Sequence, residues 1–288
     1  MKQLHDITRQ LSSAYPAGEA AALARWVMEE RFGLTLADLM MDKDNDLSPL
    51  QLQDLQNITE RLLQKEPIQY ILGQTTFCGL TFRVQPGVLI PRPETQELVE
   101  WICQETPDAE HGSKRVLDIG TGSGCIALSL ASRGFKVEAW DISDEALKIA
   151  RDNASRLALD VNFRKQDILQ KDLPESREST FDIIVSNPPY ICQREAQEMD
   201  SNVLDHEPHL ALFVPDDDPL LFYRHIAQYA ARHLAPGGRI YFEINRAFAH
   251  ETCRLLELYG FTEVEVRNDQ FDNPRMIRAI RSSLSLQP

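Results

Sequence analysis

Residues 115–124 read Arg-Val-Leu-Asp-Ile-Gly-Thr-Gly-Ser-Gly, and this stretch decides the fold. The apolar run that carries Asp118 is typical of a buried strand, and the Cys-Ile-Ala-Leu-Ser-Leu-Ala run that follows is typical of a helix. A strand, a glycine turn and a helix in that order form a nucleotide-type binding unit. Gly120, Gly122 and Gly124 carry no Cβ, so a ligand can lie against the backbone of the turn.

The spacing of these glycines restricts the kind of nucleotide. A dinucleotide fingerprint requires G-x-G-x-x-G, but Cys125 stands where the third glycine should fall when counting from Gly120. A phosphate-binding Walker loop requires Gly-Lys-Ser/Thr, and no lysine follows any of the three glycines. The ligand therefore need not carry phosphate.

Acidic residues follow two further predicted strands. Residues 136–141 read as a strand that ends in Asp141, which is placed to accept hydrogen bonds from two ribose hydroxyls. Residues 161–166 read as another strand, followed by Asp167, whose carboxylate could take an adenine amino group. An aspartate after a strand is often only a helix cap, as Asp144 can be here. Together with the glycine turn, however, the acidic strand ends favour an adenosine without pyrophosphate, and S-adenosylmethionine is the common cofactor of that description.

A second motif, residues 181–190, reads Phe-Asp-Ile-Ile-Val-Ser-Asn-Pro-Pro-Tyr. The prolines stiffen the backbone and push Asn187 towards an extended conformation. The side-chain oxygen of Asn187 and the carbonyl of Pro188 could accept both hydrogens of a planar NH2 group, with Pro189 adjoining and Tyr190 covering its flat face. Asn-Pro-Pro alone can also be a plain turn. Beside the glycine turn it predicts a pocket for an amide or an exocyclic amine.

These motifs, in this order and spacing, resemble the class I methyltransferases that methylate planar nitrogens. Residues 89–95, Leu-Ile-Pro-Arg-Pro-Glu-Thr, resemble the segment before the core in the HemK/PrmC family of protein-(glutamine-N5) methyltransferases. Residues 66–73, Glu-Pro-Ile-Gln-Tyr-Ile-Leu-Gly, and 207–212, Glu-Pro-His-Leu-Ala-Leu, also match that family. The Asn-Pro-Pro-Tyr motif is shared with adenine-N6 nucleic-acid methyltransferases, so the segment at 89–95 is the more discriminating one.

The resemblance implies methylation of the glutamine side-chain amide in the Gly-Gly-Gln motif of bacterial class 1 peptide chain release factors. An amide nitrogen is a poor nucleophile, so the site must position it, and positioning can supply effective molarities of roughly 10^5 M. The implied catalytic residues are Asn187, Pro188 and Tyr190, and with Pro189 they are the implied substrate-binding residues. The implied cofactor-binding residues are Asp118, Gly120, Thr121, Gly122, Ser123, Gly124, Asp141, Asp167 and Asn187.

Two positions depart from the family pattern. Asn245 follows the predicted strand 239–244 where relatives usually carry a glycine, and this can alter a turn near the site. Ile168 follows Asp167 where some relatives carry an aromatic ring against adenine. Neither departure touches the glycine turn or the amide corner.

The predicted fold is α/β, a class I S-adenosylmethionine-dependent methyltransferase with a mostly parallel Rossmann-like sheet, an antiparallel edge strand and a small N-terminal helical domain. Apolar positions at helical spacing predict helices at 19–32, 35–41 and 48–64 in a docking domain over residues 1–73. Residues 75–90 read as a hairpin within a linker at 74–92, with its turn near Cys78 and Gly79. The methyltransferase domain is predicted over 93–288, with helices at 219–234 and 247–259 and strands at 239–244, 261–267 and 275–281.

Composition and charge narrow the function class. The N-terminus lacks the apolar core of a signal peptide and no run of about 18 apolar residues occurs, which predicts a cytoplasmic protein without a membrane partner. Five scattered cysteines without a C-x-x-C pair indicate neither a disulfide framework nor a zinc site, and no metal is predicted.

The balance of charges bears on the substrate. Residues 1–73 hold 7 basic and 11 acidic residues and the rest of the chain 23 and 33, with a net charge of −14. A nucleic-acid enzyme would be expected to show a basic stripe, so the alternative of an adenine-N6 nucleic-acid methyltransferase is disfavoured and a protein substrate preferred. A non-enzymatic S-adenosylmethionine sensor or scaffold is a third hypothesis, which leaves the amide corner unexplained.

Overall fold

The structure is a computed structural model that describes residues 1–107, 112–170, 173 and 180–282. Its contacts divide the chain into two compact units, Met1–Gln74 with Asp200–His206, and Thr75–Met199 with Glu207–Pro288. The last six residues of the predicted methyltransferase domain lie outside the described part of the chain. Among the described residues, no helix combines the length and the apolar character needed to cross a bilayer.

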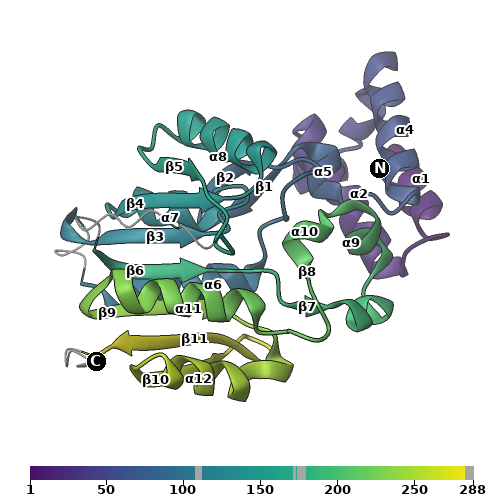
Figure 1. Cartoon of the computed structure of the whole chain (residues 1–288). Coiled ribbons are helices and arrows are strands. Elements are labelled where there is room, and N and C mark those ends of the chain that lie inside the picture. Colours follow the sequence, from purple (N-terminus) through teal and green to yellow (C-terminus); the bar gives the residue numbers. More distant parts are fainter. Residues whose placement is uncertain (108–111, 171–172, 174–179, 283–288) are drawn as a thin grey trace. The chain divides into compact units, whose positions relative to one another are not determined.

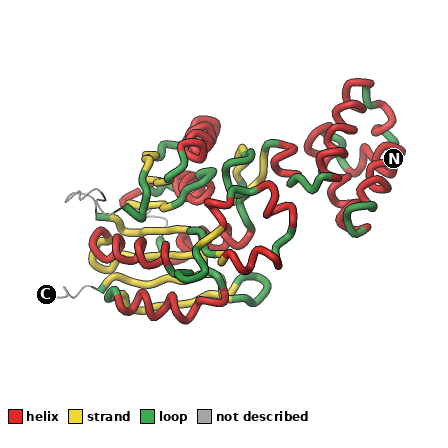
Figure 2. The backbone as a smooth tube through the Cα atoms, turned by 45° about the vertical axis from the view of Figure 1, so that its right-hand side comes forward, coloured by secondary structure: helices red, strands yellow, loops and turns green. Residues whose placement is uncertain are grey.

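The smaller unit is built of helices, drawn in red near the N label of Figure 2. Thr35 and Ser48 each begin a helix with a capping box, in which Asp38 or Gln51 returns the hydrogen bond, and this is why helices begin at these points. The helices are α1 (Lys2–Leu11), α2 (Ala17–Phe32), α3 (Leu36–Met40), α4 (Pro49–Leu63), α5 (Ile68–Leu72) and α9 (Ser201–His206), with a 3-10 turn η1 (Lys43–Asp46). The predicted helices correspond to α2, α3 and α4, whereas α1 and α5 were not predicted.

A seven-stranded sheet forms the centre of the larger unit (Figure 1). Its spatial order is β10-β11-β9-β6-β3-β4-β5, and the five strands from β9 to β5 run parallel. The strands are β3 (Arg115–Ile119), β4 (Lys136–Asp141), β5 (Asn162–Lys165), β6 (Phe181–Ser186), β9 (Leu234–Glu243), β10 (Phe261–Asn268) and β11 (Pro274–Arg281). The mostly parallel sheet predicted from the alternating pattern is confirmed.

The reversed strand is β11, which pairs antiparallel with both β9 and β10 and therefore lies one place inside the edge. The chain leaves β9, crosses through α12 (Ala249–Leu258) and places β10 one strand further out. The following tight connection then returns β11 into the gap between them. The mixed sheet agrees with the prediction, but the outermost strand on this side, β10, points the same way as the parallel strands.

Helices cover both faces of the sheet because its strands are apolar on both sides. Leu117 and Ile184 face one cluster, which they share with α11 (Leu221–His233) and α12. Val116 and Ile183, their neighbours along the strands, face the opposite cluster with α6 (Pro93–Glu105) and α7 (Cys125–Ser132). Alternation along β3 and β6 therefore produces a three-layer arrangement, with α8 (Asp144–Leu157) following β4.

The predicted hairpin forms a two-stranded sheet of β1 (Gln74–Phe77) and β2 (Leu80–Arg83). Cys78 and Gly79 make its turn, both with positive φ. Phe77 and Phe82 pack into the cluster that contains α6 and α7, so the hairpin shares a core with the larger unit. The remaining short elements are β7 (Ile191–Cys192), β8 (Phe213–Val214), α10 (His209–Leu212), and the 3-10 turns η3 (Gln193–Glu198) and η4 (Arg246–Phe248).

Candidate functional site

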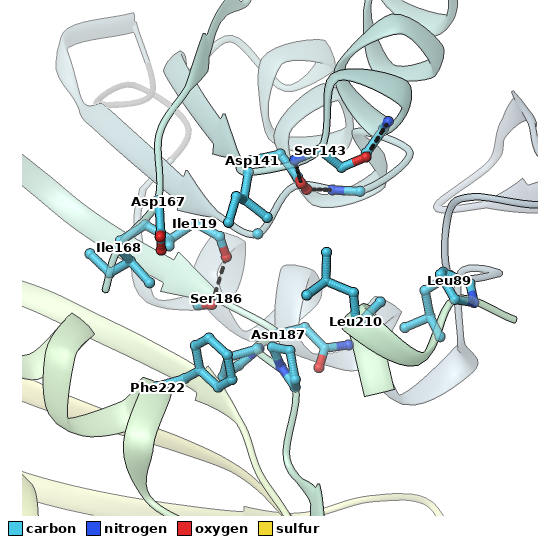
Figure 3. A pocket seen from close by; sticks show the side chains of 18 of the residues that line it. Leu89, Ile119, Asp141, Ser143, Asp167, Ile168, Ser186, Asn187, Leu210 and Phe222 are labelled. Atoms are coloured by element: carbon cyan, nitrogen blue, oxygen red, sulfur yellow. Dashed lines mark hydrogen bonds between the residues drawn. The ribbon is translucent and has the colours of Figure 1, made fainter. Parts of the chain in front are cut away.

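A cavity of about 310 Å³ opens at the carboxyl ends of the parallel strands in the larger unit. It receives Gly120 and Gly122 from the turn after β3, Asp141 from the end of β4, and Asp167 and Asn187 from the segments after β5 and β6. Figure 3 shows Asp141, Asp167 and Asn187 around one hollow. Parallel strands end at the same edge of a sheet, which is why residues distant in sequence meet here.

The glycine turn is tied to the neighbouring strand by backbone hydrogen bonds. The amides of Gly120 and Thr121 both donate to the Trp140 carbonyl oxygen over 2.9 Å. The Gly122 amide donates to Asp141 Oδ2 over 2.8 Å. A Cβ added to Gly122 would meet no atom within 4 Å, because the residue faces the cavity. The turn thus presents bare backbone to a ligand.

Two carboxylates stand at the cavity with part of their hydrogen-bonding capacity used. Asp141 accepts from Gly122 through Oδ2 and from the Ser143 amide through Oδ1 over 2.9 Å. Burial raises the pKa of the Asp141 carboxyl. Asp167 accepts from the Leu169 amide over 2.9 Å through Oδ1. Each carboxylate oxygen has a second lone pair, so both residues can accept further hydrogen bonds from a ligand.

Asp118 lies behind the turn and does not line the cavity. It is fully buried and accepts a hydrogen bond of 2.6 Å from the Thr121 hydroxyl. Burial raises the pKa of Asp118 to about 7. The Ser123 carbonyl accepts from the buried Asn153 Nδ2 over 2.9 Å, and Asn153 was not predicted as part of the site. These residues support the turn from within the core.

The amide corner after β6 rests on a buried hydrogen-bond network. Asn187 donates from Nδ2 to Thr95 Oγ1 over 3.1 Å, and Thr95 donates to Glu243 Oε2 over 2.6 Å. The Tyr190 hydroxyl donates to the other oxygen of Glu243 over 2.9 Å. Pro188 lines the cavity beside Asn187, while Tyr190 does not. Two separate segments, α6 and β9, thereby hold the corner.

The two residues predicted to depart from the family pattern, Asn245 and Ile168, both lie close to the site. Asn245 donates to the Tyr190 carbonyl over 3.1 Å and caps η4 by accepting from the Ala247 amide over 3.0 Å. Asn245 therefore anchors the backbone of the amide corner, and the expectation that this departure does not touch the corner is wrong. Ile168 lines the cavity as an aliphatic wall, and Phe222 from α11 supplies an aromatic ring to the same cavity.

Two further segments of the cavity wall are joined by Glu207, Ile90 and Arg92, which we call the Glu207 clasp. Glu207 is 4% exposed, accepts from the Ile90 amide over 3.1 Å and forms an ion pair with Arg92. Leu89 precedes one side of the clasp and Leu210 follows the other, and both line the cavity (Figure 3). Segments more than a hundred residues apart are thus held together at the side of the cavity near Asn187.

Comparison with known proteins places the chain in a family. A model described as the methyltransferase small domain matches residues 95–206, and one described as the PrmC N-terminal domain matches residues 2–73. A release factor glutamine methyltransferase from Bacteroides thetaiotaomicron is 50% identical over 277 residues, which cover 96% of this chain and 98% of the relative. The chain belongs to the release factor glutamine methyltransferase family. A release factor glutamine methyltransferase from Flavobacterium psychrophilum is 45% identical over 271 residues, which cover 93% of this chain and 94% of the relative.

The solved structures agree on the fold. The crystal structure of a methyltransferase from Pyrococcus furiosus aligns with a TM-score of 0.54 at 20% identity, covering 78% of this chain and 98% of that one. At this identity the likeness concerns the fold alone. The prediction of a class I methyltransferase fold with an N-terminal helical domain is confirmed, as is the resemblance to the HemK/PrmC family.

The predicted site residues fall into two groups in the structure. The cavity is lined by Gly120, Gly122, Asp141, Asp167, Asn187, Pro188 and Pro189, whereas Asp118, Thr121, Ser123, Gly124 and Tyr190 lie outside its lining. The roles of both groups toward cofactor and substrate stay predictions. Thr95, Glu207 and Glu243 were not predicted as site residues. Thr95 and Glu207 belong to the family-like segments 89–95 and 207–212, which pointed to these positions without giving them a role. Glu243 carried a local signal, an acidic side chain in the apolar run Ile-Tyr-Phe-Glu-Ile, which must find a partner when buried.

Proposed function

We propose that this chain transfers a methyl group from S-adenosylmethionine to the side-chain amide nitrogen, N5, of the glutamine in the Gly-Gly-Gln motif of class 1 peptide chain release factors. The observation that carries the proposal is that the glycine turn, Asp141 and Asn187 line one cavity. A cofactor and a planar nitrogen can therefore share a single cavity. Family membership favours the glutamine of a release factor as the acceptor.

The residues of the cavity fit S-adenosylmethionine. Bare backbone at Gly122 leaves room for a close approach, and Asp141 would accept hydrogen bonds from the ribose hydroxyls. Asp167 would accept from the adenine amino group, between the apolar side chains of Ile168 and Phe222. When bound, S-adenosylmethionine supplies an electrophilic methyl group on its sulfonium sulfur.

The chain's own contribution is to hold the substrate amide and to exclude water. With Nδ2 of Asn187 engaged by Thr95, Oδ1 is the atom left to accept from the glutamine NH2 group. The Pro188 carbonyl would accept the second hydrogen. Two acceptors on the NH2 hydrogens favour positive charge that develops on nitrogen as it reacts. Leu89 and Leu210 would cover the substrate side chain and exclude water from its hydrogen bonds to Asn187 and Pro188.

We propose that the helical domain, residues 1–73, docks the release factor. Its surface exposes Met40, Met41 and Leu50, with Leu50 79% exposed, and a docked protein would cover such side chains. The same domain has an excess of acidic residues, which suits a protein partner better than a nucleic acid. Because release factors work on ribosomes, we place the reaction in the cytoplasm.

A labelling experiment tests the proposal. The purified chain is incubated with methyl-labelled S-adenosylmethionine and a class 1 release factor, the same factor with its Gly-Gly-Gln glutamine changed to glutamate, or duplex DNA. We expect label on the intact release factor alone, located at the glutamine by peptide mass spectrometry. Label on DNA alone, or on neither substrate, would overturn the proposal. The Asn187→Ala variant should lose turnover while it still binds cofactor.

A further inference from the structure

Thr95 lies between the amide of Asn187 and the carboxylate of Glu243. Its Oγ1 receives Asn187 Nδ2 at 3.1 Å and donates to Glu243 Oε2 at 2.6 Å. Thr95 is 2% exposed and Glu243 is 1% exposed, so water does not compete for these bonds. The three side chains form a short relay from the core of the unit to the cavity wall.

The hydrogen count of this relay has only one solution while Glu243 is ionised. A carboxylate can accept but cannot donate, so the single hydroxyl hydrogen of Thr95 must point at Glu243. The hydroxyl then has only lone pairs to offer on its other side. Asn187 must meet it with the NH2 end of its amide, since the carbonyl end would bring two acceptors together.

Tyr190 fixes the same carboxylate from the other side. Its hydroxyl donates to Glu243 Oε1 at 2.9 Å, so both oxygens of the carboxylate are engaged by hydroxyl hydrogens. Charge-assisted hydrogen bonds of this type are stronger than neutral ones. Glu243 therefore has a set position and a set direction of hydrogen bonding.

We propose that Glu243 and Thr95 are positioning residues that fix the orientation of the Asn187 amide, so that its oxygen and not its nitrogen faces the substrate amide. This inference rests on the proposed function and deepens it. A reversed Asn187 would set its own NH2 against the glutamine NH2, two donors that cannot bond. Neither Thr95 nor Glu243 lines the cavity, so both act through Asn187.

The relay predicts a pH dependence of turnover. The titratable and charged groups that face Glu243 are Tyr190 beyond β6, Arg275 on β11, Glu94 on α6 and Tyr223 on α11. Burial raises the pKa of Glu243, and the hydrogen bonds from Thr95 and Tyr190 and the charge of Arg275 oppose that rise. Below this raised pKa, a protonated Glu243 can donate to Thr95, which can then donate to Asn187 Oδ1. The amide can reverse, and turnover should fall on the acidic side.

The decisive variants are Thr95→Val and Thr95→Ser. Valine keeps the shape but removes both the donor and the acceptor, whereas serine keeps the hydroxyl. We expect Thr95→Val to lower kcat about 10- to 100-fold, the scale of a misplaced catalytic group, with little change in the cofactor Kd or in KM for the release factor. Thr95→Ser should recover most of kcat.

Thr252→Val is the matched control. Thr252 on α12 is also fully buried, and its hydroxyl donates to the carbonyl of Phe248, the N-cap residue of that helix, over 2.8 Å. The same chemical change there should leave kcat unaltered. Wild-type kcat for Thr95→Val, or equal losses in Thr95→Val and Thr95→Ser, would overturn the inference.

The acidic limb of the wild-type pH profile gives a second readout that needs no variant. Burial also raises the pKa of Asp141, so the cofactor Kd can rise on the same limb, and kcat is therefore measured at saturating cofactor at every pH. The inference expects this kcat to fall as the pH falls, beyond any loss that incomplete cofactor binding explains. A kcat that falls only in step with cofactor binding would count against it. Failure of the proposed function looks different, because the wild-type chain would then not label the release factor glutamine at any pH.

Discussion

The Gly122 amide donates a hydrogen bond to Asp141 Oδ2 over 2.8 Å, so the shape of the glycine turn after β3 depends on the residue that ends β4. Asp141 also receives the Ser143 amide on Oδ1 over 2.9 Å. One carboxylate therefore organises two segments of the cavity wall before any ligand arrives. Its remaining lone pairs are directed by these two bonds, which is what a site for a ribose diol requires.

Asp141→Ala should weaken cofactor binding about 10- to 100-fold, because hydrogen bonds to a charged group contribute about 1.5–3 kcal/mol. The loss should include the freed Gly122 amide as well as the missing ligand contacts. Isothermal titration with S-adenosylmethionine measures the Kd. Asp160→Ala serves as the control, because Asp160 is exposed in the connection between α8 and β5, and this variant should bind the cofactor normally. An unaltered Kd for Asp141→Ala would exclude the ribose assignment.

Alanine at Gly124 and at Gly122 should produce different defects. Gly124 has φ of +82°, and its Cβ would lie 3.1 Å from Leu128 Cδ1 and 3.2 Å from Ala150 Cβ. Backbone strain of about 1–2 kcal/mol and crowding of about 1–3 kcal/mol should both lower the free energy of unfolding. Gly122 has φ of +55° but faces open space, so its alanine variant should lose less stability and more cofactor affinity.

Urea unfolding and cofactor titration of the two alanine variants separate these effects. We expect Gly124→Ala to show the larger fall in unfolding free energy. Gly122→Ala should show the larger rise in cofactor Kd for each unit of stability lost. The reverse order in either measurement would show that the cavity side of the turn has been misassigned.

Much of the sheet could be predicted because its signals are local. The predicted strand at 136–141 is β4 itself, since an apolar run, its acidic end and the next helix start are adjacent in sequence. The insertion of β11 between β9 and β10 could not be predicted in this way. Which strands become neighbours depends on how α12 packs, and no short stretch of sequence encodes it. Likewise, β2 ends at Arg83 rather than near residue 90, because the following segment turns away to form the cavity wall.

The candidate site likewise contains residues that the sequence predicts and residues that it does not. The glycine turn, Asp141, Asp167 and Asn187 each lie at or just after the end of a strand, so the rule that parallel strands end at one edge brings them together. Thr95 and Glu207 reach the site from elements that are neighbours only in the folded chain. Both belong to the family-like segments 89–95 and 207–212, but their spacing to Asn187 carries no periodic signal, so their role in the site becomes visible only through the hydrogen bonds that they make.

Stability should depend on pH through Asp118. Burial raises the pKa of this carboxyl to about 7 from an ordinary value of about 3.9 in an unfolded chain. Between these two values the folded state binds more protons than the unfolded state, so the free energy of unfolding should fall as pH rises from about 4 to about 7.

Asp118→Asn removes the titratable carboxyl and should therefore reduce the decrease of the unfolding free energy between about pH 4 and about pH 7. Relative to the wild type, the variant should become more stable with rising pH by an amount on the order of a few kcal/mol across the window. Urea unfolding at several pH values measures the difference. Burial also raises the pKa of Asp141 and Glu243, so some slope should persist in the variant. Asp160→Asn, at an exposed position, serves as the control, and its unfolding free energy should change with pH as that of the wild type does. The same pH dependence in Asp118→Asn and the wild type would contradict the prediction.

The Glu207 clasp should be needed for both stability and turnover. Glu207→Ala leaves the buried Ile90 amide and the Arg92 guanidinium without their shared partner. Because Arg92 keeps partial access to solvent, we expect a loss of about 2–4 kcal/mol in unfolding free energy, below the full effect of breaking a buried pair. Glu207→Gln keeps an acceptor for the Ile90 amide and should lose about half as much.

The catalytic consequence of the clasp follows from the side chains beside it. Leu89 and Leu210 line the cavity from the two clasped segments, so separating these segments should open the cavity near Asn187 to water. At saturating cofactor, Glu207→Ala should therefore methylate the release factor more slowly even at temperatures where it is fully folded. Glu257→Ala, at an exposed position on α12, should change neither stability nor rate. A folded Glu207→Ala protein with the wild-type rate would mean that the two leucines do not need the clasp to shield the amide.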